Sequence, residues 1–209
     1  MTLKKKSITR LLIYAIVDIQ SLGKRNPVSF AKQLIDSNVD LIQLRDKKHN
    51  TADFIKIARQ IKKIASLKKI PLIINDRISA AKLVRAFGVH LGQNDLPIKY
   101  ARKRLEKKQT IGVSCHSLSE INKALKSKVN YIAIGPIFCT KTKPDLKPMD
   151  IKILKNIIKR VTIPIFAIGG INEKNIAILK RLNITGVALI NYFITKENLK
   201  KAVKKLRTA

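Results

Sequence analysis

The chain has 209 residues, of which 45% are hydrophobic, and a formal net charge of +31. This length suits a single α/β domain, and the apolar content is sufficient for a full core, which excludes global disorder. No apolar run approaches the roughly 18 residues that a membrane span needs, so we expect no membrane association.

Short apolar runs alternate with longer amphipathic stretches along the chain. The first run, residues 11–17, follows a lysine-rich start that superficially resembles a signal peptide. It ends at Asp18 and no small-residue cleavage site follows, so we predict a strand there instead. Runs that are apolar on both faces are typical of buried parallel strands. The predicted strands are residues 11–17, 41–45, 71–75, 88–92, 110–114, 131–135, 164–170 and 186–190.

Helix-like patterns lie between these runs, with apolar residues at helical spacing. Thr51 is the expected N-cap of one helix, and Ser117 with Glu120 forms a candidate capping box for another. The predicted helices include residues 27–38, 51–67, 117–127, 172–182 and 195–206.

About eight strand–helix units follow one another without a linker. Doubly wound sheets also alternate in this way, but they usually stop at five or six strands. The pattern therefore favours an α/β fold of the closed (β/α)8 TIM-barrel type, with residues 1–209 as a single catalytic domain. Catalytic residues of such barrels lie at the C-terminal ends of the strands, so we expect the functional residues there.

Two aspartates occupy that position after successive predicted strands. Asp76 follows residues 71–75 and Asp95 follows residues 88–92, in a chain with only 13 acidic residues. Neighbouring carboxylates repel each other, and a hard divalent cation such as Mg2+ relieves the repulsion. Either residue alone is explained as well by a helix cap or a turn. The coincidence at two adjacent strand ends favours metal binding.

The segment "QLRDK" ends the second predicted strand. Side chains alternate along an extended segment, so Gln43, Arg45 and Lys47 share one face, and Leu44 and Asp46 share the other. A polar amide and two cations at a barrel mouth indicate an anion site, and arginine can bind phosphate in a bidentate way.

Later strand ends carry residues suited to phosphate. "GPIFCTKTK" places Thr140, Thr142 and Lys143 on one loop, where hydroxyls, backbone N–H groups and an ammonium can bind phosphate oxygens. The usual phosphate site of these barrels uses the loops after strands seven and eight, which points to Gly170 and to the pair Ile190-Asn191. A simple turn would explain Gly170 equally well.

The remaining polar and nucleophilic residues indicate no covalent chemistry. His90 lies within an apolar run, where we expect a buried histidine with hydrogen-bond partners and not a general base. Cys115 and Cys139 have no evident activating base, so we interpret them as packing residues. Two cysteines make neither a disulfide framework nor a four-ligand zinc site, which favours a reduced, cytoplasmic setting.

The high positive charge has two explanations, a polyanionic partner or overall composition. The lysines are spread over many segments, and no aromatic platform or nucleic-acid motif interleaves with them. We therefore favour composition and do not expect a nucleic-acid partner. The charge would still attract a small anionic substrate. The sequence leaves open whether the chain forms a homo-oligomer.

Six motifs occur in a fixed order: "QLRDK", "IINDR", "GVHLGQNDLP", "IGVSCHS", "YIAIGPIFCTKTK" and "PIFAIGGIN". Together they resemble the thiamine phosphate synthase family from Tyr14 to Phe193. The resemblance implies a Mg2+-dependent TIM-barrel transferase that joins 4-amino-2-methyl-5-hydroxymethylpyrimidine diphosphate to 4-methyl-5-(2-phosphoethyl)thiazole or its carboxylated tautomer. The products are thiamine phosphate and diphosphate. In the implied dissociative mechanism, diphosphate leaves first and the thiazole nitrogen then attacks the pyrimidine methylene cation.

Carried over by position, the resemblance assigns Asp76 and Asp95 to Mg2+, and Arg45, Ser114 and Lys143 to catalysis. The pyrimidine diphosphate contacts that it implies are Gln43, Leu44, Arg45, Asp46, Lys47, Asn75, Ser114 and Lys143. The implied thiazole phosphate contacts are Thr140, Lys141, Thr142, Gly170, Ile190 and Asn191.

The chain departs from the family at two positions, with Asn191 where serine is usual and Asp150 near a usual glycine. Two alternatives stay open. One is a thiazole tautomerase-like relative on the same barrel, which would not need the full set of diphosphate ligands. The other is a basic nucleic-acid-binding protein that has kept the barrel.

Overall fold

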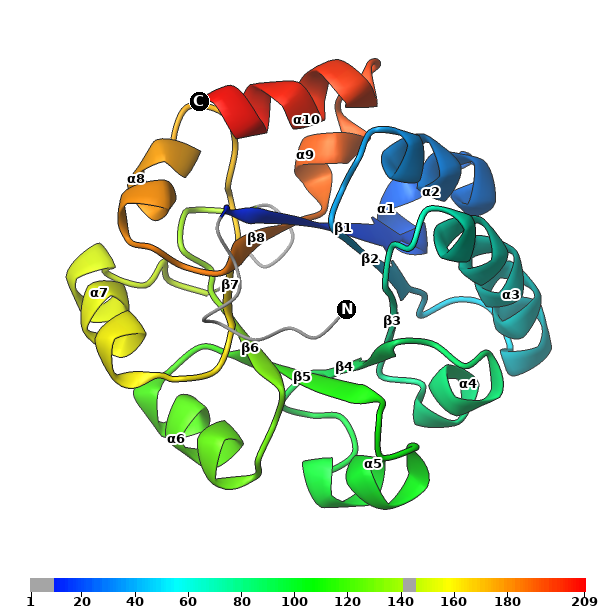
Figure 1. The fold of residues 1–209 in the computed structure, drawn as a ribbon, viewed down its shortest axis with the longest axis horizontal. Coiled ribbons are helices and arrows are strands. Elements are labelled where there is room, and N and C mark those ends of the chain that lie inside the picture. The colour runs from blue at the N-terminus through cyan, green and yellow to red at the C-terminus, as the bar shows by residue number, and fades with distance from the viewer. Residues whose placement is uncertain (1–9, 141–145) are drawn as a thin grey trace.

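The computed structural model describes residues 10–140 and 146–209, and within them eight parallel strands form a closed barrel (Figure 1). Each strand pairs with the next along the chain, and β8 pairs with β1, from Leu12 opposite Gly186 to Ala15 opposite Leu189. The predicted (β/α)8 barrel is therefore confirmed. The strands are β1 (Leu12–Asp18), β2 (Leu41–Arg45), β3 (Leu72–Asn75), β4 (Gly88–Leu91), β5 (Thr110–Cys115), β6 (Tyr131–Ile134), β7 (Ile165–Ile168) and β8 (Gly186–Leu189).

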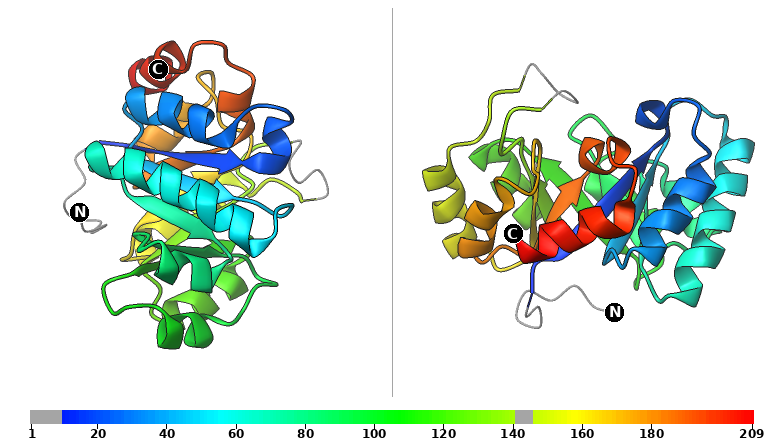
Figure 2. Two further views of the ribbon diagram at one scale, coloured as in Figure 1. Left: turned by 90° about the vertical axis from the view of Figure 1, so that its right-hand side faces the viewer. Right: turned by 90° about the horizontal axis from the view of Figure 1, so that it is seen from above.

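Helices surround the barrel as an outer layer (Figures 1 and 2). Of those that the described residues form, none is long and apolar enough to cross a membrane. The helices are α1 (Ile19–Leu22), α2 (Pro27–Asp36), α3 (Thr51–Leu67), α4 (Ile78–Leu83), α5 (Ile98–Arg104), α6 (Leu118–Lys126), α7 (Ile151–Arg160), α8 (Ile176–Arg181), α9 (Asn191–Ile194) and α10 (Leu199–Thr208).

Several boundaries differ from the prediction because polar side chains bind backbone groups. The helix expected from residue 172 begins at Ile176, since Asn175 accepts a hydrogen bond from the Asn172 N–H and closes a turn first. The N-cap of α3 is Asn50 and not Thr51, because the Asn50 side chain accepts from the Asp53 N–H. Such local side-chain bonds compete with the helical ladder.

The capping box of α6 is present in altered form. Ser117 accepts from the Glu120 N–H as predicted, but the Glu120 carboxylate accepts from the His116 N–H and not from that of Ser117. Asp150, near the position where the family usually has glycine, caps α7 by accepting from the Lys152 N–H at 2.6 Å. Its φ of −59° suits any residue, so glycine is not required there.

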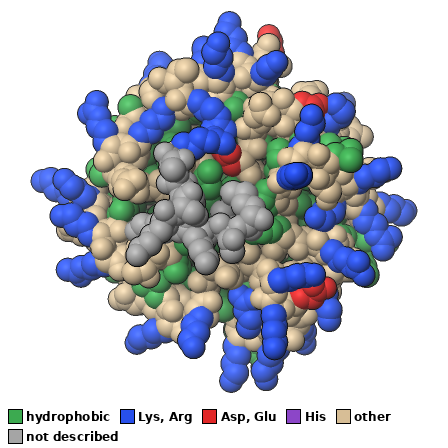
Figure 3. All heavy atoms as spheres, viewed as in Figure 1, with side chains coloured by type: hydrophobic (Ala, Val, Ile, Leu, Met, Phe, Trp, Pro, Cys, Tyr) green, Lys and Arg blue, Asp and Glu red, His purple; other side chains and the backbone are tan. Residues whose placement is uncertain are grey.

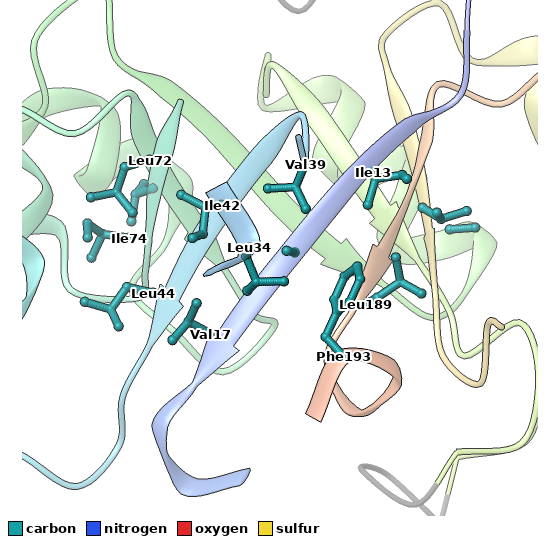
Figure 4. Close-up of a cluster of buried hydrophobic side chains, with 14 of the residues drawn as sticks. Ile13, Val17, Leu34, Val39, Ile42, Leu44, Leu72, Ile74, Leu189 and Phe193 are labelled. Carbon is teal, nitrogen blue, oxygen red and sulfur yellow. The ribbon is translucent and has the colours of Figure 1, made fainter. Parts of the chain in front are cut away.

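The larger of two hydrophobic clusters lies between the strands and the helices (Figure 4). Every second residue of β1 belongs to it, including Ile13 and Val17, and Leu34 of α2 lies in the same cluster beside Val17. Leu44 of β2 lies in the same layer and is fully buried. This layer holds the helices against the outside of the barrel.

The second cluster fills the barrel interior and has an aromatic centre. Tyr14 of β1 packs edge-on against Phe166 of β7 and Tyr131 of β6, with ring centroids 5.3 and 6.2 Å apart. Gly112 of β5 makes room for this packing, because a Cβ there would lie 1.9 Å from Cζ of Tyr131. Side chains therefore fill the barrel interior, and a substrate site can lie only at its ends.

Candidate active site

Polar side chains at or just after the ends of β2, β3 and β4 meet at one end of the barrel. Lys47 contacts the Asp76 carboxylate with its ammonium, which also lies 3.9 Å from Asp95 Oδ1. Asn75 donates a hydrogen bond to Asp76 at 3.1 Å. The two aspartates that the sequence singled out therefore lie close enough to share one cation.

The alternative roles of these aspartates, a helix cap for Asp76 and a turn for Asp95, have different outcomes. Asp76 does not cap α4, whose N-cap is Arg77 without a side-chain cap. Asp95 does make a turn, because its Oδ2 accepts from the Gly92 N–H at 2.6 Å, yet its Oδ1 faces Lys47. Both carboxylates thus have an oxygen directed at the same cation.

The backbone of Asp76 is also unusual, with a φ of 52°. The other non-glycine residues with positive φ in the described ranges directly follow the C-cap of a helix, where this conformation is common. Asp76 instead follows the strand β3. Sparsely populated backbone conformations are often retained at functional sites, which agrees with a special role for Asp76.

The segment 43–47 alternates as predicted. Gln43 points into the barrel and donates to Tyr14 Oη at 2.6 Å, whereas Leu44 packs in the outer layer. Arg45 donates to the buried Asp18 at 2.8 Å. Asp18 was not predicted as a site residue, although it ends β1 and so occupies the same kind of strand-end position.

Asp46 faces away from the charged cluster. Its carboxylate is buried and accepts hydrogen bonds from the backbone N–H groups of Lys48 and His49, and it also contacts His49 Nδ1 at 2.9 Å. Burial alone would raise the pKa of Asp46, but these hydrogen bonds outweigh it and the pKa is lowered overall. The side chain of Asp46 therefore holds the loop after β2 in place.

Ser114 of β5 lies beside His90 of β4, with its hydroxyl oxygen 2.9 Å from His90 Nε2. The other ring nitrogen of His90 lies 3.0 Å from the Tyr131 hydroxyl. His90 is thus a buried histidine with hydrogen-bond partners, as predicted. Gln93 donates to the Ser114 carbonyl oxygen at 2.5 Å, a contact that no sequence pattern indicated.

The two cysteines have different environments. Cys115 is buried, and burial together with the nearby Glu120 raises the pKa of its thiol to about 12, in keeping with a packing role. Cys139 is exposed, so its interpretation as a packing residue is wrong. It lies on the loop after β6.

The loops after β6 and β7 pack tightly against each other. Gly169 and Gly170 have φ values of 101° and 64°, so β7 ends at Ile168 and not at residue 170 as predicted. A Cβ on Gly170 would lie 2.3 Å from the carbonyl oxygen of Cys139. The lack of a side chain at Gly170 therefore serves the contact between these loops.

The remaining predicted phosphate ligands lie in the same two loops and after β8. Thr140 lies in the described part of the loop, whereas Lys141, Thr142 and Lys143 lie outside the described residues. Ile190 directly follows β8 and is the N-cap residue of α9, which begins at Asn191. A short extra helix at this point is part of the usual phosphate site of these barrels.

Comparison with known proteins shows what this chain is similar to. A family model described as thiamine monophosphate synthase matches residues 13–193. The thiamine-phosphate synthase of Clostridium tetani is 40% identical over 194 residues, 93% of each chain, and that of Methanobrevibacter smithii is 37% identical over 86% of each chain. A solved structure, thiamine phosphate pyrophosphorylase from Pyrococcus furiosus, has a TM-score of 0.86 at 29% identity and covers 95% of this chain and 94% of that chain.

Proposed function

Because the chain belongs to the thiamine monophosphate synthase family, we propose that it joins the hydroxymethylpyrimidine diphosphate to the thiazole phosphate, forming thiamine phosphate and releasing diphosphate. The observation that carries the proposal is the cluster at the barrel mouth, where Lys47 contacts Asp76 and approaches Asp95. Such a cluster suits a substrate with a dense negative charge and a metal ion to balance it.

The residues of this cluster fit Mg2+. Asp76 and Asp95 come from adjacent strand ends and already direct an oxygen each at one cation, the Lys47 ammonium. Mg2+ commonly takes one or two carboxylates and completes its shell with water and phosphate oxygens, and Asp76 and Asp95 would supply the carboxylates. Among the described residues there is no group of three or more potential metal ligands. When bound, Mg2+ would neutralise charge that develops on the departing diphosphate.

The protein's own cations and donors serve the same leaving group. Arg45, anchored by Asp18, and Lys47 offer positive charge, while Asn75 and Ser114 offer neutral hydrogen-bond donors. We assign Lys143 the same role. Donors aimed at developing charge need no protein nucleophile, and the raised thiol pKa of Cys115 also argues against covalent catalysis at that residue.

Within segment 43–47 we assign roles according to the direction in which each side chain points. Gln43 faces the barrel interior and is assigned to the pyrimidine, together with Arg45 and Lys47 for the diphosphate. Leu44 and Asp46 point away from the mouth, so we assign their part in binding to the backbone and to the shape of the segment.

We propose the other side of the mouth for the thiazole phosphate. We assign it to Thr140, to Lys141 and Thr142, to Gly170 and to the backbone N–H groups of Ile190 and Asn191. The start of α9 directly after β8 supports this, since backbone N–H groups at such a point bind phosphate.

One assay tests the proposed function. The purified protein is incubated with both substrates and Mg2+, and thiamine phosphate and diphosphate are measured, with each substrate omitted in turn as a control. Formation of both products only in the complete mixture is expected. Conversion of a carboxylated thiazole tautomer without the pyrimidine, and no thiamine phosphate, would instead indicate the tautomerase-like alternative.

The setting of the protein follows from the same assignment. Its partners are small phosphorylated substrates, and its working place is the cytoplasm, in keeping with two free cysteines. Size-exclusion chromatography with light scattering tests whether it forms a homo-oligomer.

A further inference from the structure

A chain of hydrogen bonds crosses the barrel interior below the proposed diphosphate site. It begins where Gln43 Nε2 donates to Tyr14 Oη at 2.6 Å, and the Tyr14 hydroxyl lies 3.0 Å from that of Tyr131. It continues from Tyr131 Oη to His90 Nδ1 at 3.0 Å, and from His90 Nε2 to Ser114 Oγ at 2.9 Å. Residues of β1, β2, β4 and β6 are thus linked by hydrogen bonds to the Ser114 hydroxyl of β5.

Since each buried hydroxyl has one proton to donate, the amide donor of Gln43 sets the direction of these hydrogen bonds. Tyr14 accepts from Gln43, so its own hydroxyl proton goes to Tyr131. Tyr131 accepts that proton and donates its own to His90 Nδ1. An imidazole that accepts at Nδ1 carries its proton on Nε2 and donates it to Ser114 Oγ.

We infer that Tyr131 is a positioning residue, which fixes the proton of His90 on Nε2 and thereby leaves the Ser114 hydroxyl proton free to point away from His90, toward the barrel mouth. The inference rests on the proposed function for one step only, the assignment of Ser114 to the diphosphate. A hydroxyl that already accepts from His90 can donate to a phosphate oxygen, and such charge-assisted bonds are stronger than neutral ones.

The packing of the barrel interior supports this series of hydrogen bonds. Tyr131 starts β6, and its ring reaches across β5 to stack on His90 of β4, with centroids 5.6 Å apart. This crossing needs Gly112, since a Cβ on β5 at that point would lie 1.9 Å from the Tyr131 ring. Both tyrosines are fully buried, and burial raises the pKa of each hydroxyl, which keeps them protonated as donors.

The position of the His90 proton can be measured without any substrate. The chain has three histidines, so a 15N NMR spectrum of the imidazoles is simple, and the His90→Gln variant identifies the signals of His90. At a pH of about 8, above the usual histidine pKa, we expect a protonated Nε2 and an unprotonated Nδ1. In Tyr131→Phe, which lacks the donor to Nδ1, the population should shift toward the form protonated on Nδ1. A wild-type His90 protonated on Nδ1, or no shift in a folded Tyr131→Phe, would overturn the inference.

A double-mutant cycle tests the consequence for the reaction. With Ser114 present, Tyr131→Phe should lower kcat about tenfold, the effect of losing one hydrogen bond to a charged group. In the Ser114→Ala background the same change should cost less than about twofold, because there is no hydroxyl left to direct. Equal losses in both backgrounds would mean that Tyr131 acts only on the fold and would overturn the inference.

A matched control separates this role from the loss of a buried hydroxyl in general. Tyr192→Phe removes a hydroxyl that donates to the Ala202 carbonyl oxygen at 3.2 Å, between α9 and α10 and outside the chain of bonds. It should leave the His90 imidazole signals unchanged. If Tyr192→Phe moved those signals as much as Tyr131→Phe does, the specific link through Tyr131 would be refuted. The NMR result stands even if no thiamine phosphate forms, so failure of the proposed function and failure of this inference can be told apart.

Discussion

Arg45 donates a hydrogen bond to the carboxylate of Asp18 at 2.8 Å, so the last residues of two adjacent strands are joined by an ion pair. The Asp18 side chain is only 3% exposed, while that of Arg45 is 30% exposed. The buried partner also accepts from the Ser21 hydroxyl at 2.7 Å. Asp18 thus acts as a buried anchor for the partly exposed Arg45.

Asp18→Asn keeps the size of the side chain and an acceptor for Ser21, but it removes the charge that holds Arg45. We expect the KM for the pyrimidine diphosphate to rise about tenfold, because an arginine side chain that must be ordered on binding contributes less to the binding free energy. Steady-state kinetics check this. Asp36→Asn is the control, since it breaks the exposed pair with Lys32, and exposed pairs contribute little. An unchanged KM in Asp18→Asn would show that Arg45 needs no anchor.

The proposed metal ligands make a second test. Asp76→Asn and Asp95→Asn should each lower the rate roughly 100-fold at limiting Mg2+, since the stabilisation of the leaving group is weakened. Mg2+ binding measured by calorimetry should weaken in parallel, so the metal is followed directly as well as through activity. Asp53→Asn on the surface of α3 serves as the control. Near-normal rates of both variants at limiting Mg2+ would remove these residues from the metal site.

Asp46 gives a prediction for stability against pH. Its pKa is lower in the folded protein, so its carboxylate stabilises the fold above the ordinary aspartate pKa of about 3.9, and this contribution is lost as the pH falls below that value. At neutral pH, Asp46→Asn should lower the free energy of unfolding by about 1–3 kcal/mol, the effect of hydrogen bonds to a charged group. Urea denaturation at a series of pH values measures the difference. A difference that stays constant into the acid range would contradict the assignment.

The departure at Asn191 concerns the thiazole phosphate. Asn191 is the first residue of α9, and the proposed contact there uses backbone N–H groups, which any residue except proline supplies. Asn191→Ser should therefore change the apparent affinity for thiazole phosphate by no more than about 0.5 kcal/mol. Asn191→Pro, which deletes a donor, should weaken binding much more. A large gain in affinity from Asn191→Ser would show that the side chain decides this site.

The net charge of +31 gives a fifth prediction. Lys and Arg side chains are distributed around the whole visible face of the molecule in Figure 3 and do not gather in one stripe. Binding to random RNA should accordingly be weak and fall steeply with salt, as counterion release requires. Activity should survive an excess of RNA at physiological salt. A tight, sequence-selective RNA complex under those conditions would favour the nucleic-acid alternative.

The sequence was sufficient for the fold because the strands are short, mainly apolar runs, and polar residues lie at or just after the ends of several of them. That rule located Asp76 and Asp95, and it would have located Asp18 had it been applied to the first strand. Helix starts were harder to predict, because an asparagine side chain can either cap a helix or close a turn. Asn50 caps a helix and Asn175 closes a turn, and local geometry decides between the two.

The contacts across the barrel interior could not be predicted. Whether Tyr131 reaches His90 depends on the register of three strands and on the space above Gly112. No local sequence pattern predicts either of these. In the sequence, Tyr131 is simply the first residue of an apolar run. The exposure of Cys139 was missed for a similar reason, since it depends on how two loops pack.

The pairing of β8 with β1 has a consequence for how the protein is made. The two strands lie near opposite ends of the chain, and Arg207 near the C-terminus also binds Asp40, which in turn accepts from the Ile13 N–H of β1. Contacts so distant in sequence form slowly, because a long loop must close before they stabilise anything. During synthesis β1 therefore has only one of its two neighbours until residues 186–189 have emerged. Until then its second edge is a hydrogen-bonding surface open to other chains, a hazard that the finished barrel no longer has.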